Sequence, residues 1–266
     1  MRQMHICQRE LHSWGRANQV QFDPEKESMH VVARHDSFGE EFKILGVEFD
    51  CKLLMHTAVH DTASSASWKL RTIMRSSRFF TDSEVILHYK SHILSYIEHR
   101  TPGIYHACAS TLRPLDAVQT SLLRNLGINE VDALVHFNLA PLQCRRDMAM
   151  LGVIHRCVIG QGPAHFQQFF NREDSLVVHR TRFSHRRHNK QLKDPRVARF
   201  SEQMPRSALG LVSVYNLLPQ EAVGTPAVSS FQAVLQSMLK DFATAGCPEW
   251  EGLFSPRVPL YRHLLR

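Results

Sequence analysis

The chain has 266 residues, of which 43% are hydrophobic and 21% are charged, and its formal net charge at pH 7 is +7. This composition is typical of a globular protein of one large domain or two small ones, and it excludes a disordered chain. No apolar run approaches the ~20 residues that a membrane-spanning helix needs, and the polar N-terminus does not resemble a signal peptide. The six cysteines are spread singly without Cys-x-x-Cys spacing, which favours reduced thiols in an intracellular protein of the nucleus or cytoplasm.

The positive charge is concentrated in one window. Residues 179–199 hold eight Lys or Arg and a single acid, Asp194, so this window accounts for the whole excess of basic residues. A local cluster of this kind suits a polyanion such as nucleic acid better than a diffuse basic surface does. We therefore predict an exposed basic arm whose candidate contacts are Arg180, Arg182, Arg186, Arg187, Lys190 and Lys193.

The first fifty residues predict a helix and a small β element. Residues 2–16 have helical periodicity, with Gly15 at the end, and residues 30–34 are a short strand after a polar turn at Asp23-Pro-Glu-Lys26. The stretch from Phe42 to Asp50 alternates like a strand with one buried face, which would carry Leu45, Val47 and Phe49.

The segment from Lys52 to Arg78 predicts a long helix. Ala63, Ala66, Leu70, Ile73 and Met74 form its apolar face at 3.6-residue spacing. The adjacent face carries Ser64, Trp68, Arg71, Arg75 and Arg78. Arginines one turn apart can follow a phosphate backbone and a Trp can stack, but a solvated basic stripe has the same pattern. The sequence leaves both interpretations open.

The rest of the chain is predicted to be helical apart from the basic arm. A capping box, Thr81-Asp-Ser-Glu84, starts one helix, which Thr101-Pro-Gly103 ends. Further helices are expected over 112–126 with Gly127 as the end, after Pro141, from about Arg206, and from an N-cap at Ser229 or Ser230.

Several segments, in this order, resemble the LINE-type (non-LTR) retrotransposon reverse transcriptases. Leu11-x-x-Trp14 and Asp23-Pro-Glu-Lys26 are similar to the palm of that family, although Asp23 and Glu27 depart from its usual Asn-x-x-Lys-Thr. Phe42 to Asp50 looks like the Phe-x-Tyr-Leu-Gly-Val-x-x-Asp junction of palm and thumb. The later matches are Leu139-Ala-Pro-Leu142 with Arg145-Arg146-Asp147, His179-Arg-Thr-Arg182, Asn216-Leu-Leu-Pro219 and Ser230-Phe231.

The resemblance implies a mainly α fold with a small β element near the N-terminus, the remnant of a right-hand polymerase palm followed by a helical thumb and a helical extension. It would divide the chain into a palm tail (1–51), a thumb-like bundle (52–130), a helical extension (131–178), a basic arm (179–200) and a C-terminal helical segment (201–266).

The same resemblance indicates which chemistry to expect. The family enzyme polymerises with Mg²⁺ held by carboxylates, two of them in an Asp-Asp turn. This sequence has no Asp-Asp pair, and its first palm match lies downstream of that turn. We therefore expect no cofactor and no polymerase activity from this chain alone. Lys26 occupies the position of the palm lysine proposed to protonate pyrophosphate, although an exposed turn lysine would look the same.

The expected function is thus nucleic-acid binding, to RNA or an RNA/DNA duplex, by a reverse-transcriptase fragment. The alternatives are an all-helical protein-interaction domain with a basic localisation signal, or a decayed element without selected function. His56/His60 and His88/His92 have the i, i+4 spacing of metal ligands. Neither pair has the Glu or Cys partners of a known metal motif, so we predict no metal site. The oligomeric state does not follow from the sequence.

Overall fold

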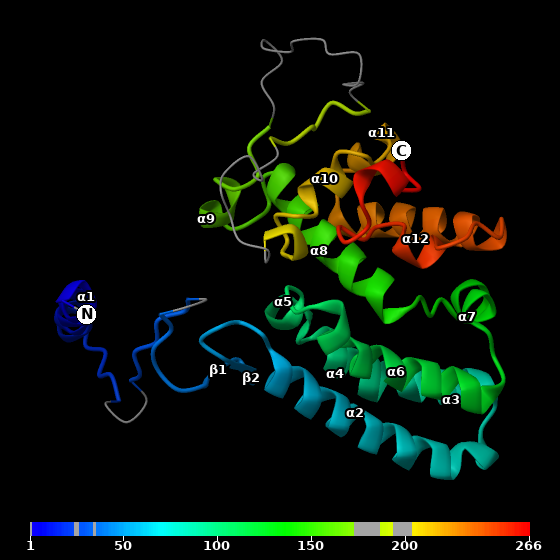
Figure 1. The fold of residues 1–266 in the computed structure, drawn as a ribbon, viewed down its shortest axis with the longest axis horizontal. Coiled ribbons are helices and arrows are strands. Elements are labelled where there is room, and N and C mark those ends of the chain that lie inside the picture. The colour runs from blue at the N-terminus through cyan, green and yellow to red at the C-terminus, as the bar shows by residue number, and fades with distance from the viewer. Residues whose placement is uncertain (1, 24–26, 34–35, 173–186, 194–203) are drawn as a thin grey trace. The chain divides into compact units, whose positions relative to one another are not determined.

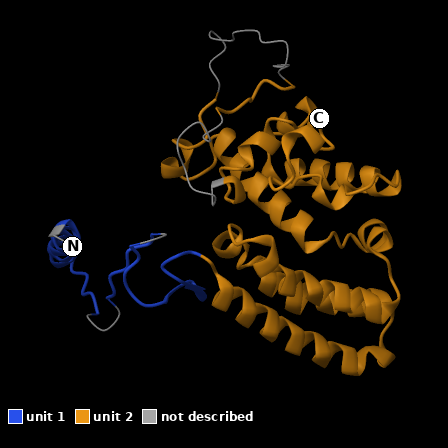
Figure 2. Cartoon of the chain, viewed as in Figure 1, with its two compact units in different colours: residues 1–53 blue, residues 54–266 orange. Residues whose placement is uncertain are grey.

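A computed structural model describes residues 2–23, 27–33, 36–172, 187–193 and 204–266. The chain divides into two compact units, residues 1–53 and residues 54–266 (Figure 2). The expectation of a mainly helical chain with a small β element near the N-terminus is confirmed. The boundaries expected at residues 130, 178 and 200 stay predictions.

The first unit consists of one helix, a pair of short strands and connecting segments. Helix α1 spans Arg2–Ala17, so Gly15 lies inside the helix instead of ending it. Gly15 allows the Phe22 ring to pack directly on the helix, because a Cβ at this position would lie 2.4 Å from Phe22 Cε2. Leu11 and Trp14 of α1 are more than half exposed.

The stretch from Phe42 to Asp50 is a β-hairpin, so the expected single strand is wrong. Strands β1 (Phe42–Ile44) and β2 (Val47–Phe49) pair antiparallel, with Ile44 opposite Val47. Leu45 and Gly46 form the turn, with φ of +49° and +79°, as a tight primed hairpin turn requires. Leu45 is therefore 86% exposed while Val47 is buried. The expected strand at 30–34 is also absent from the described residues of that stretch; Val31 makes only an isolated bridge to Phe38.

The second unit contains the remaining helices in two layers (Figure 1). One layer holds α2 (His56–Ser76), α3 (Asp82–Tyr89), α4 (Ser95–Glu98), α5 (Thr101–Ile104) and α6 (Ala109–Leu126). The other holds α8 (Leu142–Val158), α9 (Ala164–Gln167), α10 (Val212–Tyr215), α11 (Gln220–Val223) and α12 (Val228–Thr244). Helix α7 (Glu130–Phe137) joins the layers. None of the described helices is long and apolar enough to cross a bilayer.

Helices α2 and α6 form the base of the first layer and run in the same direction. Near their starts His56 Nδ1 lies 3.2 Å from Thr111 Oγ1, and near their ends Arg75 and Asn125 line one groove. The predicted apolar face of α2 is buried at Ala63, Ala66 and Leu70. Helix α6 starts three residues earlier than expected and ends as expected at Gly127, whose φ is +66°.

The second layer has the larger apolar core, in which α8, α10, α11 and α12 meet. Tyr215, Phe231 and Leu235 are fully buried there together with Leu151 and Ile154. The expected helix from Arg206 is only a short 3₁₀ turn, Met204–Arg206, followed by α10. Helix α12 begins at Val228 without a side-chain cap, so neither Ser229 nor Ser230 is the N-cap.

Between α3 and α5 the chain is helical except for a two-residue turn at His99 and Arg100. A π-helical turn, Lys90–Leu94, links α3 to α4, and Pro102 and Gly103 lie within α5 instead of stopping a helix. Proline is tolerated there because the first turn of a helix needs no main-chain donor.

The capping box at Thr81 yields a test of local stability. The Thr81 hydroxyl accepts from the Glu84 main-chain N–H and donates to the Glu84 carboxylate, which also accepts from the Thr81 N–H at 2.8 Å. We expect Thr81→Ala to lower the free energy of unfolding by about 1 kcal/mol, measured by urea denaturation of the full chain. Thr81→Ser keeps the hydroxyl and serves as the control; equal loss in both variants would contradict the role of the cap.

Candidate functional site

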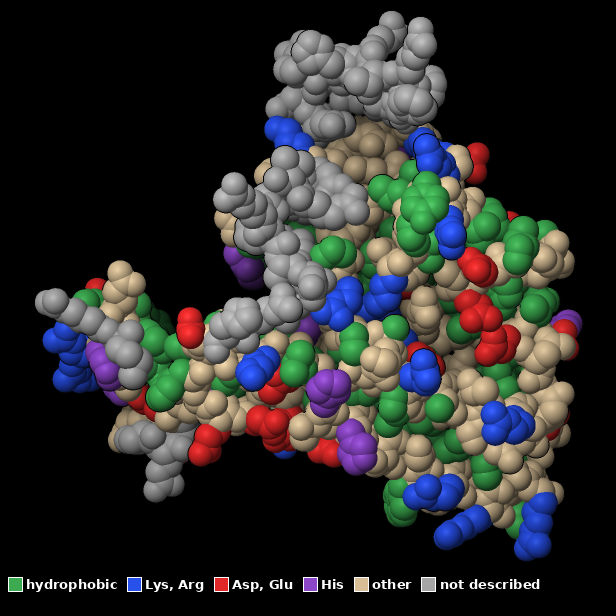
Figure 3. Space-filling view, in the orientation of Figure 1, with side chains coloured by type: hydrophobic (Ala, Val, Ile, Leu, Met, Phe, Trp, Pro, Cys, Tyr) green, Lys and Arg blue, Asp and Glu red, His purple; other side chains and the backbone are tan. Residues whose placement is uncertain are grey.

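The outer side of α2 carries the candidate contacts that the sequence predicted. Trp68 is 62% exposed, and Arg71 and Arg75 are exposed on the same side of the helix. Arg78 follows in the 3₁₀ turn Ser77–Phe79, where its guanidinium lies 4.7 Å from the centre of the Phe79 ring. In Figure 3, Lys and Arg side chains gather at the edge of the molecule where α2 ends. The structure thus places these four residues in one row.

A groove between α2 and α6 runs beside this row. Its volume is about 590 Å³, and Leu70 and Val118, both buried, form its floor. Arg71 and Arg75 line one wall and Ser121 and Asn125 line the other. The second wall cannot be inferred from the sequence, because only the packing of α6 on α2 brings these polar residues opposite the arginines.

The electrostatics of this groove favour an anion. Among the residues that the structure describes, its lining includes no Asp or Glu, and no hydrogen bond or ion pair engages the Arg71 or Arg75 guanidinium. Two unpaired guanidiniums one helical turn apart, beside a hydroxyl and an amide, can donate hydrogen bonds to successive phosphate oxygens.

The described part of the basic arm is anchored in the second layer instead of being exposed throughout. His188 and Leu192 are buried, and His188 Nε2 lies 3.0 Å from the Tyr215 main-chain oxygen. Arg187 donates to the main-chain oxygens of Leu265 and Arg266, and Lys190 Nζ donates to that of Val223 at 2.6 Å. Burial lowers the pKa of Lys190, and the nearby Arg172 lowers it further.

These contacts divide the predicted cations of the arm. The Arg187 guanidinium and the Lys190 amine are held by carbonyls of their own chain, while Lys193 is exposed. The other candidates, Arg180, Arg182, Arg186 and the palm-lysine candidate Lys26, lie outside the described residues.

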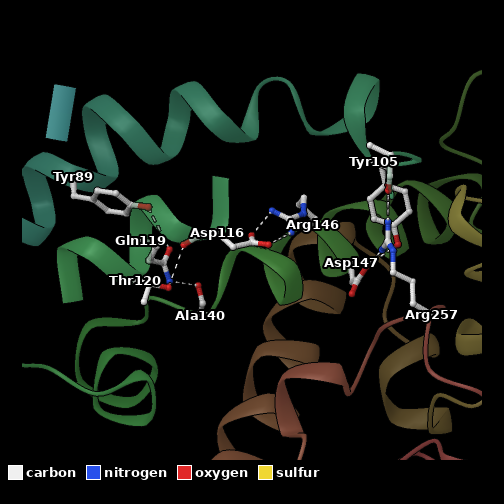
Figure 4. A network of polar contacts seen from close by, with 10 residues as sticks. Tyr89, Tyr105, Asp116, Gln119, Thr120, Ala140, Arg146, Asp147 and Arg257 are labelled. Atoms are coloured by element: carbon white, nitrogen blue, oxygen red, sulfur yellow. Dashed lines mark hydrogen bonds and ion pairs between the residues drawn. The ribbon is translucent and has the colours of Figure 1, made fainter. Parts of the chain in front are cut away.

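A network of polar side chains at the start of α8 connects the two layers of the second unit (Figure 4). The Arg146 guanidinium donates to both oxygens of Asp116 on α6, at 2.8 and 3.1 Å. The Tyr105 hydroxyl donates to Asp147 at 2.6 Å, and Arg257 lies 4.0 Å from the same carboxylate. In the sequence, Arg146 and Asp147 stand out only as part of a family match, because their partners lie too far along the chain to be inferred from spacing.

Burial decides the protonation of Asp147. The carboxyl is 1% exposed, and its Oδ2 has no hydrogen-bond partner among the described residues. Desolvation raises its pKa to about 7, against the opposing effects of the Tyr105 hydroxyl and of the Arg257 and Arg146 guanidiniums. Asp147 therefore carries a proton through much of the range in which an ordinary Asp is ionised.

The histidines considered as metal ligands have other partners. His60 Nδ1 lies 3.2 Å from Asp61, and the His88 and His92 rings stack with centres 6.1 Å apart. Within the described residues no group of three or more His, Cys, Asp or Glu could hold a metal ion.

The second layer has a buried polar centre of its own around Tyr215. The Tyr215 hydroxyl lies 3.0 Å from His155 Nδ1, His155 Nε2 lies 3.1 Å from the Thr225 oxygen, and the His155 ring stacks on Phe231. Desolvation lowers the pKa of His155, so the neutral ring is favoured. Both ring nitrogens of His155 and the Tyr215 hydroxyl thus have partners within this network.

The geometry thus defines a mainly helical protein with a basic groove on its α2–α6 layer. Comparison with protein-family models, curated proteins and solved structures gave no match to this chain.

The raised pKa of Asp147 gives a prediction about pH. Because the folded state keeps a proton that the unfolded state loses near pH 4, the contribution of this group to stability falls as pH rises from about 4 to 7, by at most about 1.4 kcal/mol per pH unit. Asp147→Asn removes this contribution while its amide oxygen can still accept from Tyr105. We therefore expect the free energy of unfolding of the variant, relative to that of the parent protein, to increase between pH 5 and 7.

Urea denaturation of both proteins at several pH values measures this difference. Other titrating groups, such as Glu251, whose burial raises its pKa to about 7, are present in both proteins and cancel. A difference independent of pH would show that Asp147 is already ionised at pH 5.

Proposed function

We propose that this chain is the C-terminal part of a LINE-type reverse transcriptase and that it binds an RNA or RNA/DNA duplex along the α2–α6 groove. The observation that carries the binding proposal is the row of unpaired cations, Arg71 and Arg75, on one wall of that groove beside the exposed Trp68. The family assignment rests on the ordered sequence matches from Leu11 to Phe231.

The chemistry of the groove supports contacts to the backbone of a nucleic acid. Arginine binds phosphate through paired N–H donors, and Ser121 and Asn125 add neutral donors on the opposite wall. The buried floor of Leu70 and Val118 fixes the spacing of the two walls, because α2 and α6 pack tightly there. Trp68 offers an aromatic face on which a base or sugar can stack. Contacts to phosphates and sugars do not distinguish one base from another, so the proposal predicts binding with little dependence on sequence.

The second candidate is a protein-interaction domain with the basic arm as a localisation signal. One observation favours this candidate. Arg187 and Lys190 donate to main-chain carbonyls of the second layer, so these two cations are engaged by the fold and not by a phosphate. Replacing Arg180, Arg182 and Arg186 by Gln separates the two candidates. Loss of nucleic-acid binding supports the first, and loss of nuclear accumulation alone supports the second.

The groove itself is tested by Arg71→Gln with Arg75→Gln in one chain. We expect weaker binding to an RNA/DNA duplex, and a slope of log K against log salt that is smaller by about 2, because two phosphate contacts are lost. Fluorescence anisotropy between about 50 and 200 mM salt measures both quantities.

The matched control is Arg9→Gln with Arg16→Gln, which removes the same charge from α1 in the first unit. If both double variants weaken binding equally, net charge and not the groove is responsible. If the parent protein binds with the same affinity at low and physiological salt, the assignment of Arg71 and Arg75 to phosphates is wrong.

A further inference from the structure

A second groove, of about 730 Å³, lies between α8 and α12 and is lined by several polar side chains together with the apolar Met148, Ala149 and Ala233. The lining side of α12 carries Ser229, Gln232, Gln236, Ser237 and Lys240, while its apolar residues Phe231 and Leu235 face the core. The groove is therefore not an uncovered part of the hydrophobic core.

The two ends of this groove differ in charge. Helices α8 and α12 run antiparallel here: Gly152 lies against Gln232, and a Cβ at Gly152 would be 2.7 Å from Gln232 Nε2. Arg145 at the start of α8 and Lys240 near the end of α12 therefore lie at the same end of the groove. Lys90 lies outside the lining but close to it, since its amine donates to the main-chain oxygen of Phe137, next to the lining residue Asn138. Burial lowers the pKa of Lys90, and the charges of Arg145 and Lys240 lower it further.

Only part of this charge is balanced. Glu98 forms an ion pair with Arg145 and is the one acid among the described lining residues. The Lys90 amine donates to the Phe137 main-chain oxygen, but no hydrogen bond or ion pair within the described part of the chain engages the Lys240 amine. Within the groove itself Arg145 and Lys240 face one carboxylate, Glu98, so this end has a net positive charge that would attract an anionic group such as a phosphate monoester.

The rest of the groove offers neutral hydrogen-bonding groups. Gln236 Nε2 is buried and has no hydrogen-bond partner among the described residues, so a ligand oxygen would satisfy a donor that is otherwise unpaired. The described lining has no aromatic ring on which a base could stack. A polar body such as a sugar, with an anionic group at one end, fits this distribution of donors and charge.

We propose that the α8–α12 groove binds a phosphate monoester of a small polar molecule. The phosphate lies between Arg145 and Lys240, and the polar body extends along Gln236 and Gln232. This site is separate from the α2–α6 groove and does not depend on the proposed binding of a duplex.

The test is isothermal titration calorimetry of the full chain with ribose 5-phosphate. We expect saturable binding to this probe and none to ribose. Lys240→Gln should weaken binding about tenfold, because a charge-assisted hydrogen bond is lost, and Glu98→Gln should tighten it by removing the competing carboxylate. Lys43→Gln, an exposed lysine of β1, is the control and should bind like the parent chain.

Two sources of the phosphate are distinguished by competition. A 5′-phosphorylated oligonucleotide that displaces ribose 5-phosphate, when its unphosphorylated counterpart does not, identifies a nucleic-acid end as the source. Displacement by inorganic phosphate but by neither oligonucleotide identifies a free metabolite.

The proposal is overturned if ribose 5-phosphate does not bind, or if Lys240→Gln and Glu98→Gln both leave its affinity unchanged. The Arg71→Gln, Arg75→Gln variant should bind ribose 5-phosphate normally, so failure of the duplex proposal and failure of this one are separable.

Discussion

The pairing of Arg146 with Asp116, and of Asp147 with Tyr105, is the constraint on which the second unit depends. These two consecutive residues at the start of α8 contact α6 and the segment after α5, so they hold the layer of α2 to α6 against the layer of α8 to α12. Arg146 is 5% exposed and Asp147 is 1% exposed, so removing one partner would leave a buried polar group unsatisfied. The α8–α12 groove depends on the same attachment, since Arg145 precedes this pair in the helix and meets Glu98 of α4.

Periodicity and capping signals were sufficient to predict most of the long helices. The capping box at Thr81, the apolar stripe of α2 and the glycine after α6 each act through neighbours in sequence, so a single sequence contains the whole signal. The hairpin at Leu45 was missed because that position of a primed turn usually holds Asn, Asp or Gly, and a leucine in an alternating stretch looks like part of a strand.

The sites were harder to predict, because their walls come from separate helices. The arginine row on α2 follows from spacing within one helix, whereas Ser121 and Asn125 become relevant only when α6 lies beside it. The basic window shows the opposite error: its composition predicts exposure, yet His188 and Leu192 are buried against α10 and its neighbours. The composition of a window describes all its residues together. It therefore does not reveal that two residues among charged neighbours are buried.

The common direction of α2 and α6 has a further electrostatic consequence. Each helix carries a dipole whose negative end lies at its C-terminus, equivalent to about half an elementary charge. Both negative ends lie at the same end of the α2–α6 groove, where Arg75, Arg78 and Arg124 are found. These arginines partly neutralise main-chain carbonyls, so the potential there is less positive than their number suggests. At Arg71, one turn further from the helix ends, the helix dipoles offset less of the positive potential that a bound anion would meet.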